Sequence, residues 1–387
     1  MAKVDVYTLG QYGVNRVKSP IHVLDGELLN AQNAAPRTAA GQLAIGKRDG
    51  MAIINEDAAA GTLLGIYNIP FDSTIADFGE RSGNACVTIT DRNYRGGAWS
   101  PELGLFAVVG SSGAATDRVM TSPDGVTWTP QTTPATAITW QEICWSADIG
   151  LFCACGTGGT LATRIMTSPD GVTWTNQTAP AELGAPIAIC AGDGKFVIIS
   201  SDTNGGVGIS TDGVNWSGNI GLPNSISWEA ITYAEGLGLF CAVGSTTNTD
   251  AIATSSDGVT WTTQSLPELA GRFDIAYSPQ YDRLVAVGEH NGGSDVYYSD
   301  NGSDWIGTDF PTTLDCGAVA WSPELGLFIA TADDGLSSND IRLSQDGITW
   351  HDAETNCALV NISDVIWSPA LNKFLLTTLG SSFEILS

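Results

Sequence analysis

Three histidines are the side chains best suited to proton transfer or zinc binding near neutral pH. They are His22, His290 and His351, and they lie in unrelated positions of the chain. The sequence shows neither the partners of a catalytic triad nor a zinc-ligand spacing for these histidines. We therefore expect them to have core or surface roles, and we predict no catalytic residue, no metal site and no cofactor.

Other residues that could take part in catalysis or ligand binding can also be explained without a functional site. Arg118, Arg164 and Arg342 occupy the same position of an internal repeat, before its third strand, so they do not indicate a convergent carboxylate site. The acidic pair Asp333–Asp334 lacks the spaced oxygen ligands of a calcium loop. Glycine- and serine-rich phrases such as GSSGAATD, from Gly110, lack the lysine of a phosphate loop and are interpreted as hairpin loops.

The eight cysteines form no CxxC or cysteine–histidine metal pattern. Several of them replace apolar residues of sister repeats, which is typical of small buried thiols in a chain that folds in a reducing cytoplasm. Cys153 and Cys155 face the same side of a predicted strand, so a metal or redox pair at these two residues stays open.

Six copies of one phrase, of the form S-x-D-G-x-x-W, organise the chain. Serine, aspartate and glycine at this spacing predict a tight turn in which the carboxylate accepts backbone N–H groups, and the tryptophan predicts a large apolar wedge between neighbouring sheets. The aspartate or asparagine and the tryptophan of the six copies are Asp124, Trp128, Asp170, Trp174, Asp212, Trp216, Asp257, Trp261, Asn301, Trp305, Asp346 and Trp350.

A second phrase, such as WSPELGLFAVVG from Trp99, occurs seven times and precedes each box. A repeat of 42–46 residues with little helix signal predicts an all-β, seven-bladed β-propeller with four-stranded blades. The last repeat supplies only three predicted strands, ending at residues 383–387. We predict that strand 85–90, which lies before the first blade, pairs with 383–387 and closes the ring, because closure removes an unpaired strand edge.

The six boxes resemble the Asp-box of neuraminidase-type propellers, although here the aspartate and glycine are adjacent. The resemblance covers about residues 85–387 and implies fold rather than activity, because such boxes lie on the periphery of the propeller. The sequence does not show the catalytic pattern of sialidases, which consists of three arginines, a tyrosine–glutamate pair and an acid–base aspartate. A sialidase-like hydrolase is therefore the less favoured alternative.

Charge separates the chain into two parts. The net charge is −26, and residues 1–60 are neutral, so the excess lies in the predicted propeller. An acidic surface repels nucleic acid and anionic lipid, and no apolar run is long enough for a membrane span. We therefore expect no direct nucleic-acid binding and no membrane contact.

Residues 1–70 break the repeat and are predicted to be an irregular docking segment, separate from the propeller at 71–387. Within them, the phrase GQLAIGKRDGMAIIN predicts two short strands around a turn at Lys47 and Arg48 that Gly50 closes, and Thr62–Phe71 predicts a further strand. A region this small and polar needs a partner surface to become ordered.

This opening loosely resembles bacteriophage tail nozzle or hub structural proteins over about 40 residues. The matching residues include Asp25, Asn33, Lys47, Arg48 and Gly50. The resemblance implies a non-enzymatic virion structural protein, assembled in the host cytoplasm as a homo-oligomeric ring with other virion proteins. The alternative is a carbohydrate- or receptor-binding tail fibre or decoration module, in which the loops between strands bind a surface glycan.

Overall fold

The chain divides into two compact units, unit 1 at Met1–Ile75 and unit 2 at Ala76–Ser387. The computed structural model describes the backbone of nine strands between residues 3 and 88. It also describes residues 93–386, with gaps at 112–117, 135–137, 203–204, 224–225, 246–249, 268–270, 290–293, 309–314, 334–338, 354–361 and 379–381. The boundary falls at Ile75, a little after the position expected from the sequence. Of the residues that carry the phage resemblance, Asp25, Asn33 and Arg48 lie outside the described residues.

Unit 1 consists of short antiparallel strands, so the prediction of an irregular segment is wrong in the parts that the structure describes. β5–β8 form a four-stranded meander, β2 pairs with β3, and β1 pairs with β4. Order arises between neighbouring segments, because β6 and β7 each contain an apolar run and pair along their length, from Lys47 opposite Gly50 to Leu43 opposite Ile54. The strands are β1 (Lys3–Val4), β2 (Tyr7–Gly10), β3 (Gly13–Arg16), β4 (Ile21–His22), β5 (Ala35–Ala39), β6 (Gln42–Lys47), β7 (Gly50–Asp57) and β8 (Thr62–Asn68).

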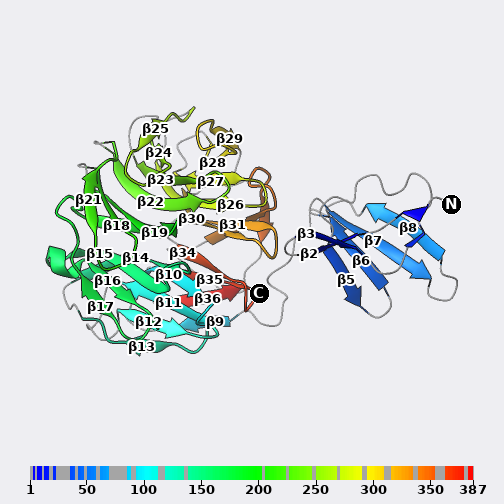
Figure 1. Ribbon diagram of the computed structural model, residues 1–387, viewed down its shortest axis with the longest axis horizontal. Coiled ribbons are helices and arrows are strands. Elements are labelled where there is room, and N and C mark those ends of the chain that lie inside the picture. Colours follow the sequence, from blue (N-terminus) through cyan, green and yellow to red (C-terminus); the bar gives the residue numbers. More distant parts are fainter. Residues whose placement is uncertain are drawn as a thin grey trace. The chain divides into compact units, whose positions relative to one another are not determined.

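Unit 2 is an all-β propeller with four-stranded blades (Figure 1). Six blades each consist of four consecutive antiparallel strands. The first three blades are β10 (Tyr94–Ser100), β11 (Leu105–Gly110), β12 (Val119–Ser122) and β13 (Thr129–Gln131); β14 (Ile138–Ser146), β15 (Leu151–Gly158), β16 (Ile165–Ser168) and β17 (Thr175–Gln177); and β18 (Pro186–Gly192), β19 (Lys195–Ser200), β20 (Gly206–Ser210) and β21 (Ser217–Ile220).

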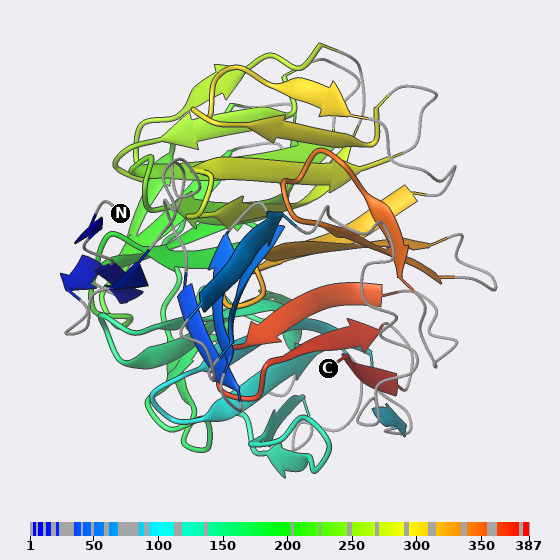
Figure 2. The ribbon, with the colours of Figure 1, turned by 90° about the vertical axis from the view of Figure 1, so that its right-hand side faces the viewer.

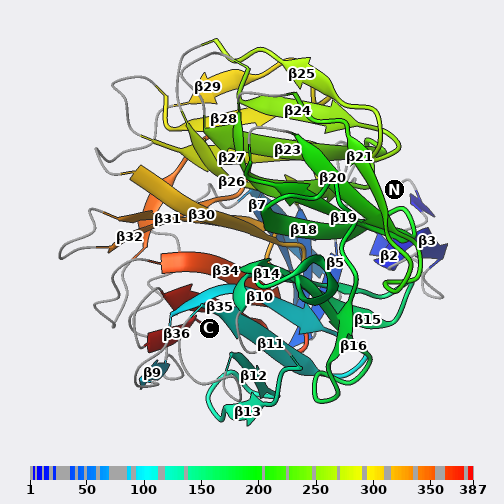
Figure 3. The same ribbon diagram turned by 90° about the vertical axis from the view of Figure 1, so that its left-hand side faces the viewer.

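The next three blades repeat the arrangement. They are β22 (Ser227–Ala234), β23 (Leu239–Ser245), β24 (Ile252–Ser255) and β25 (Thr262–Gln264); β26 (Arg272–Ser278), β27 (Arg283–Gly288), β28 (Val296–Ser299) and β29 (Ile306–Thr308); and β30 (Asp315–Ser322), β31 (Leu327–Asp333), β32 (Asn339–Ser344) and β33 (His351–Ala353). Figure 3 shows first strands such as β14 and β34 near the centre and fourth strands such as β13 and β25 at the edge.

The last repeat does not form a blade of four consecutive strands, so the structure has six such blades rather than the seven blades predicted from the sequence. It supplies three strands, β34 (Ile362–Ser368), β35 (Lys373–Thr378) and β36 (Ser382–Leu386), and its sheet is completed by β9 (Ala85–Thr88). β36 pairs antiparallel with β9, with Ser382 opposite Thr88 and Ile385 opposite Ala85. Figure 2 shows β9 beside the C-terminal strand. The sheet is thus composite, and β34 packs against both β30 and β10.

The core lies on the second strand of each sheet, because this strand is covered by its own sheet and by the neighbouring sheets. One large apolar residue per repeat is fully buried there, at the position that the sequence phrase marks. These residues are Phe106, Phe152, Phe196, Phe240, Leu284, Phe328 and Phe374.

The turn between the first and second strands requires a left-handed backbone. Gly104 and Gly150 have φ of 60° and 72°. Where the repeat lacks glycine, Asp282 and Asn372 adopt φ of 48° and 55°. Asparagine and aspartate tolerate this region better than other non-glycine residues, so the turn keeps its geometry in every sheet where these residues occur.

Among the described residues, no helix is long and apolar enough to cross a membrane. Within the described residues of the propeller, helical structure is limited to a 3₁₀ turn at Leu161–Thr163.

Candidate functional site

The predicted box residues form turns between the third and fourth strands of the blades. In the second copy, the Oδ1 atom of Asp170 accepts the N–H groups of Val172 (2.8 Å) and Thr173 (2.6 Å). The Ser168 hydroxyl accepts the N–H of Gly171 at 2.8 Å, and the Trp174 indole N–H donates to the Gly171 carbonyl at 3.0 Å. The box is therefore a self-contained turn whose polar groups are engaged within seven residues.

The backbone N–H groups that point at each box carboxylate stabilise its charged form. The N–H groups of Thr260 and Val259 lower the pKa of Asp257 to about 2. In the fifth copy Asn301 replaces the aspartate, and its Oδ1 still accepts the N–H groups of Ser303 and Asp304, both at 2.8 Å. An acceptor oxygen, rather than the charge, is thus what the turn requires.

Replacing Asp170 by alanine is expected to lower the free energy of unfolding by about 1–2 kcal/mol, because two N–H groups lose their acceptor. The matched control is Asp170→Asn, which copies the natural residue of the fifth box and is expected to cost less than half as much. Urea denaturation followed by tryptophan fluorescence measures both. Equal losses for the two variants would contradict the acceptor role.

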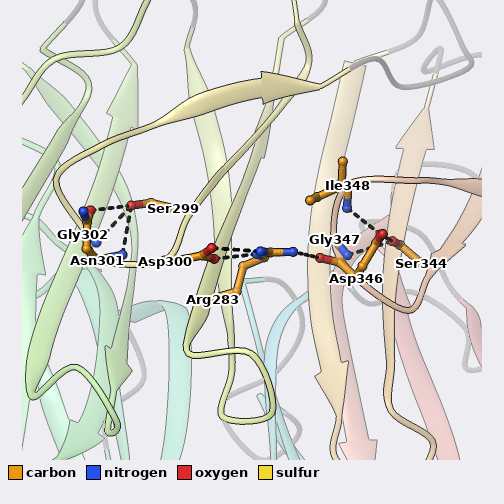
Figure 4. A network of polar contacts seen from close by, with 9 residues as sticks. All are labelled: Arg283, Ser299, Asp300, Asn301, Gly302, Ser344, Asp346, Gly347 and Ile348. Carbon is orange, nitrogen blue, oxygen red and sulfur yellow. Dashed lines mark hydrogen bonds and ion pairs between the residues drawn. The ribbon is translucent and has the colours of Figure 1, made fainter. Parts of the chain in front are cut away.

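One arginine connects two of these boxes (Figure 4). Arg283 forms a two-point ion pair with Asp300, with Nε–Oδ1 and Nη2–Oδ2 distances of 2.6 and 2.9 Å. Its Nη1 donates to the main-chain carbonyl of Asp346 in the next blade at 2.6 Å. The guanidinium also lies over the ring of Tyr298, 4.7 Å from the centroid. Its planar fork thus ties blade five to blade six.

The repeated arginines and tryptophans also join blades rather than form a site. Arg118 donates from Nη1 to the carbonyl of Ile138 in the following blade, and Arg164 does the same to Gly184. Trp174 packs in an apolar cluster with Ala107 of the preceding blade. For Arg118, Arg164 and Trp174, contacts with the neighbouring blade therefore explain the repeated positions.

The other candidates from the sequence stay apart. Lys47 and Gly50 pair across the β6–β7 hairpin of unit 1, so local strand pairing explains this spacing. His351 lies on the fourth strand of its blade and His22 on β4, while His290 and Asp334 lie outside the described residues. In the described part of the chain no three His, Cys, Asp or Glu side chains are grouped to hold a metal ion.

The six cysteines whose side chains the structure describes have free thiols. Cys153 and Cys155 lie on β15 and are fully buried. Burial raises the pKa of both thiols well above the usual range. Thiols in such surroundings are poor nucleophiles, so these two residues behave as core side chains.

Three carboxyl groups on first strands of different blades interact electrostatically, and we call them the axial carboxyl set: Glu142, Asp274 and Asp364. They lie on the first strands β14, β26 and β34, each directly after a β-bulge. A bulge adds one residue to the strand and redirects the side chains beside it, which places the carboxyls away from the sheet. All three side chains are partly exposed.

Two members of the set are held by backbone amides of two blades. The Oδ2 atom of Asp364 accepts the N–H of Gly97 on β10 at 2.8 Å, and its Oδ1 accepts the N–H of Val365 at 2.7 Å. Asp274 repeats this arrangement with Val319 on β30 (2.8 Å) and Ile275 (2.7 Å). Both oxygens of each aspartate are thus engaged, and each aspartate bridges adjacent sheets.

The third member has a free oxygen. The Oε1 atom of Glu142 accepts the N–H of Ile143 at 2.8 Å. Among the contacts of the described residues, none engages its Oε2 atom. Glu142 therefore keeps one oxygen for a further partner, which distinguishes it from Asp274 and Asp364.

The pKa values of the three carboxyl groups are raised above their usual range. Burial raises the pKa of Asp364 to about 6 even though backbone N–H groups oppose the shift. Burial and the charge of Asp364 raise the pKa of Asp274 to about 7. Burial, then the charge of Asp364 and that of Asp274, raise the pKa of Glu142 well above its usual range. The pKa values of Asp364 and Asp274 lie near neutral pH, where a carboxyl group can exchange protons.

The axial carboxyl set was not among the residues predicted from the sequence, although a signal exists. Each member lies ten residues before the buried apolar residue of the next strand, at Phe152, Leu284 and Phe374. An acidic residue at that repeat position interrupts an apolar strand, as in RFDIAYS, and buried acids of this kind are uncommon without a role. The convergence itself cannot be deduced from the repeat.

The comparisons with known proteins give information about the fold of the chain. No family model matches the chain, and no curated protein matches it. Among solved structures, a virginiamycin B lyase from Staphylococcus aureus has a TM-score of 0.64 at 14% identity, covering 78% of this chain and 98% of that one. A streptogramin B lyase has a TM-score of 0.64 at 12% identity, covering 78% and 97%.

Two further structures cover the same 78% of the chain. A virginiamycin B lyase variant from Staphylococcus aureus with quinupristin, described as catalytically inactive, has a TM-score of 0.64 at 15% identity and is covered to 98%. The WD40 β-propeller domain of Doa1 has a TM-score of 0.58 at 13% identity and is covered to 95%. At these identities the likeness shows the β-propeller fold alone.

These comparisons correct the predicted function. A virion structural protein without enzymatic activity was predicted, yet the four structures described above are three lyases and a WD40 domain, and nothing in them indicates a virion. The error arose because the phage resemblance was short and loose. Lys47 and Gly50, part of that match, are the paired ends of an ordinary hairpin.

Proposed function

We propose that unit 2 is an enzyme and that Glu142 is its general acid–base at the propeller axis. The observation that carries this proposal is the free Oε2 atom of Glu142 beside two carboxyls whose own oxygens are engaged. A carboxyl group whose pKa is raised toward the working pH can both donate and accept a proton during one reaction cycle, and the pKa of Glu142 is raised well above its usual range by burial and by the charge of Asp364.

An elimination fits this chemistry. A lyase of that type removes a proton from one atom and protonates a leaving group on another, and one carboxyl can perform both steps in turn. The fold likeness to virginiamycin B and streptogramin B lyases supports the choice of reaction class, although not of substrate. Glu142 takes the substrate proton, and the same carboxyl then returns it to the leaving group.

The acid–base group is a carboxyl rather than an imidazole. The lyase variant described as inactive carries a histidine-to-alanine substitution. In this chain the first strands β10, β14, β18, β22, β26, β30 and β34 carry no histidine. The carboxyl groups on these strands therefore supply the proton-transfer chemistry at the axis.

Glu142→Gln is the test, because glutamine keeps the shape of the side chain and loses the proton. Quinupristin is the first probe, with its consumption followed by liquid chromatography. We expect the wild-type chain to consume the probe and Glu142→Gln to be at least ~100-fold slower. Glu102→Gln, on a turn at the other end of the first strands, is the control and is expected to keep the wild-type rate. An unchanged rate in Glu142→Gln would overturn the proposal.

We also infer that the composite sheet serves as a seventh blade and that the chain is an Asp-box propeller. The packing of β34 against β10 and β30 supports the first inference, because it leaves no break in the ring. The six turns with one shared hydrogen-bond pattern support the second. A homo-oligomeric ring, a bound surface glycan and the lack of nucleic-acid and membrane binding stay predictions.

A further inference from the structure

We propose that an ordered water molecule binds at the β-bulge of β30, where it bridges the hydroxyl of Thr331 and the main-chain carbonyl of Ile362. Thr331 lies on β31 in blade six, and Ile362 is the first residue of β34 in the composite sheet. The water therefore connects two neighbouring sheets of the propeller. Neither residue belongs to the axial carboxyl set, so the site does not depend on the proposed function.

Thr331 carries a hydroxyl at a repeat position where an apolar side chain is usual. It lies three residues after Phe328. The equivalent residues of five other sheets are apolar: Val109, Cys155, Ile199, Val243 and Val287. Valine has the same branched shape as threonine, so packing alone does not account for the hydroxyl. Thr331 is 1% exposed, and its Oγ1 atom has no hydrogen-bond partner among the described residues. A buried hydroxyl of this kind lowers stability unless it has a partner.

The composite sheet shows how a protein group satisfies the same hydroxyl. There Thr377 is the equivalent of Thr331, and it too is fully buried. The Oγ atom of Ser363 lies 2.9 Å from the Oγ1 atom of Thr377 and donates to the main-chain carbonyl of Tyr94 on β10 at 2.7 Å. Ser363 is the extra residue of the β-bulge in β34. One hydroxyl group at the bulge thus bridges the threonine and the next sheet.

Blade six has the same two groups around its bulge, but a glycine in place of the serine. Gly317 is the extra residue of the bulge in β30, directly before Ala318, which is opposite Thr331. A Cβ atom on Gly317 would lie 3.4 Å from the carbonyl oxygen of Ile362 and 3.9 Å from the Oγ1 atom of Thr331. Among the described residues other than its chain neighbours, no further atom would come within 4 Å. There is room for one hydroxyl-sized group beside the two oxygens.

Water fits the chemistry of this place. It can accept the hydrogen bond of the Thr331 hydroxyl and donate one to the Ile362 carbonyl. Buried waters make about two to four hydrogen bonds and bind where polar groups would otherwise have no partner. Both protein groups are uncharged oxygens, which favours a neutral ligand over an anion, and two oxygens are too few to hold a metal ion.

Thr331→Val is the first test, because valine is the residue of three sister sheets and has a methyl group in place of the hydroxyl. With the water bound, the variant loses a satisfied hydrogen bond, and we expect its melting temperature to fall by on the order of 2 °C. Thr377→Val is the matched control, because its hydroxyl has a protein partner in Ser363, and a similar fall is expected. Thermal melting of the full chain, monitored by circular dichroism, measures both. A Thr331→Val variant that melts at or above the wild-type temperature would overturn the proposal, because removal of an unpartnered hydroxyl does not lower stability.

Two substitutions of Gly317 test the position of the water. The φ of Gly317 lies outside the left-handed region, so both substitutions fit the backbone. Serine puts its Oγ atom where the water binds, and Gly317→Ser is expected to melt at or above the wild-type temperature. The methyl group of alanine excludes the water and offers no hydrogen bond, so Gly317→Ala is expected to melt on the order of 2 °C below Gly317→Ser. Equal melting temperatures for the two variants would contradict a hydrogen-bonding ligand at this bulge.

A crystal structure of the full chain at high resolution tests the site directly. The expected result is electron density for one water within about 3 Å of both the Thr331 Oγ1 atom and the Ile362 carbonyl oxygen. In Gly317→Ser the serine Oγ atom is expected to take its place. A wild-type site without this density would overturn the proposal, even if the variants change the melting temperature as expected.

Discussion

A chain that starts at residue 93 is expected to lose the folded propeller or to melt on the order of 10 °C lower than a chain that starts at residue 85. The two chains differ by β9, which completes the composite sheet through its pairing with β36. Without β9 the edge of β36 has unpaired amides and carbonyls, and such edges are prone to aggregation. Thermal melting monitored by circular dichroism, together with light scattering, measures the difference.

The full-length chain provides a second form of this experiment. Val87 is opposite Phe383 in the β9–β36 pair, and proline at this position has no amide hydrogen and interrupts strand pairing. Val87→Pro is therefore expected to lower the melting temperature, whereas Val87→Thr, which keeps the amide and the β-branched shape, is expected to preserve it. Equal melting temperatures for chains starting at 85 and 93 would show that β9 does not hold the ring.

The propeller is expected to be less stable at pH 8 than at pH 5, and Asp274→Asn is expected to reduce that difference. The folded-state pKa of Asp274, about 7, lies above the value of an unfolded aspartate, so the folded chain binds more protons between about pH 4 and pH 7. Stability therefore falls as the pH rises through this window and levels off above it. For Asp274 the loss is on the order of 2 kcal/mol.

Below pH 4 the sign reverses. The folded-state pKa of Asp257 is about 2, so its contribution is present above the unfolded value and is lost as the pH falls toward 2. A stability maximum near pH 4–6 is the combined expectation. Urea midpoints at pH 5 and pH 8 for the wild type and Asp274→Asn provide the measurement. The same midpoint difference in both proteins would contradict the role of Asp274.

Local features of the fold were predictable because their contacts are short in sequence. The box turn engages Ser168, Asp170 and Trp174 within seven residues, so its hydrogen bonds follow from the phrase itself. The apolar second strands were predictable for a similar reason, since burial on both faces requires a continuous apolar run. The connection of β9 to the last sheet was expected from counting the strands of each repeat.

The candidate site was not predictable in this way. Gly96 and Gly97 resemble an ordinary strand end in the sequence, and their importance lies in the two carboxyls that approach them from β14 and β34. Arg118 and Arg164 were recognised as a repeated feature, but not as donors to the next blade. The short phage resemblance predicted the wrong function, because hairpin turns of glycine and charged residues occur in many unrelated folds.

The sequence by itself determined the repeat, the strands within it and the turns that join them, because each depends on neighbours a few residues away. Only the tertiary structure decided that Glu142, Asp274 and Asp364 meet. These residues are about 90 or more apart in the chain, and no local pattern relates them. They interact because the first strands of the sheets surround one axis, which brings side chains of distant blades within range of one another's charge.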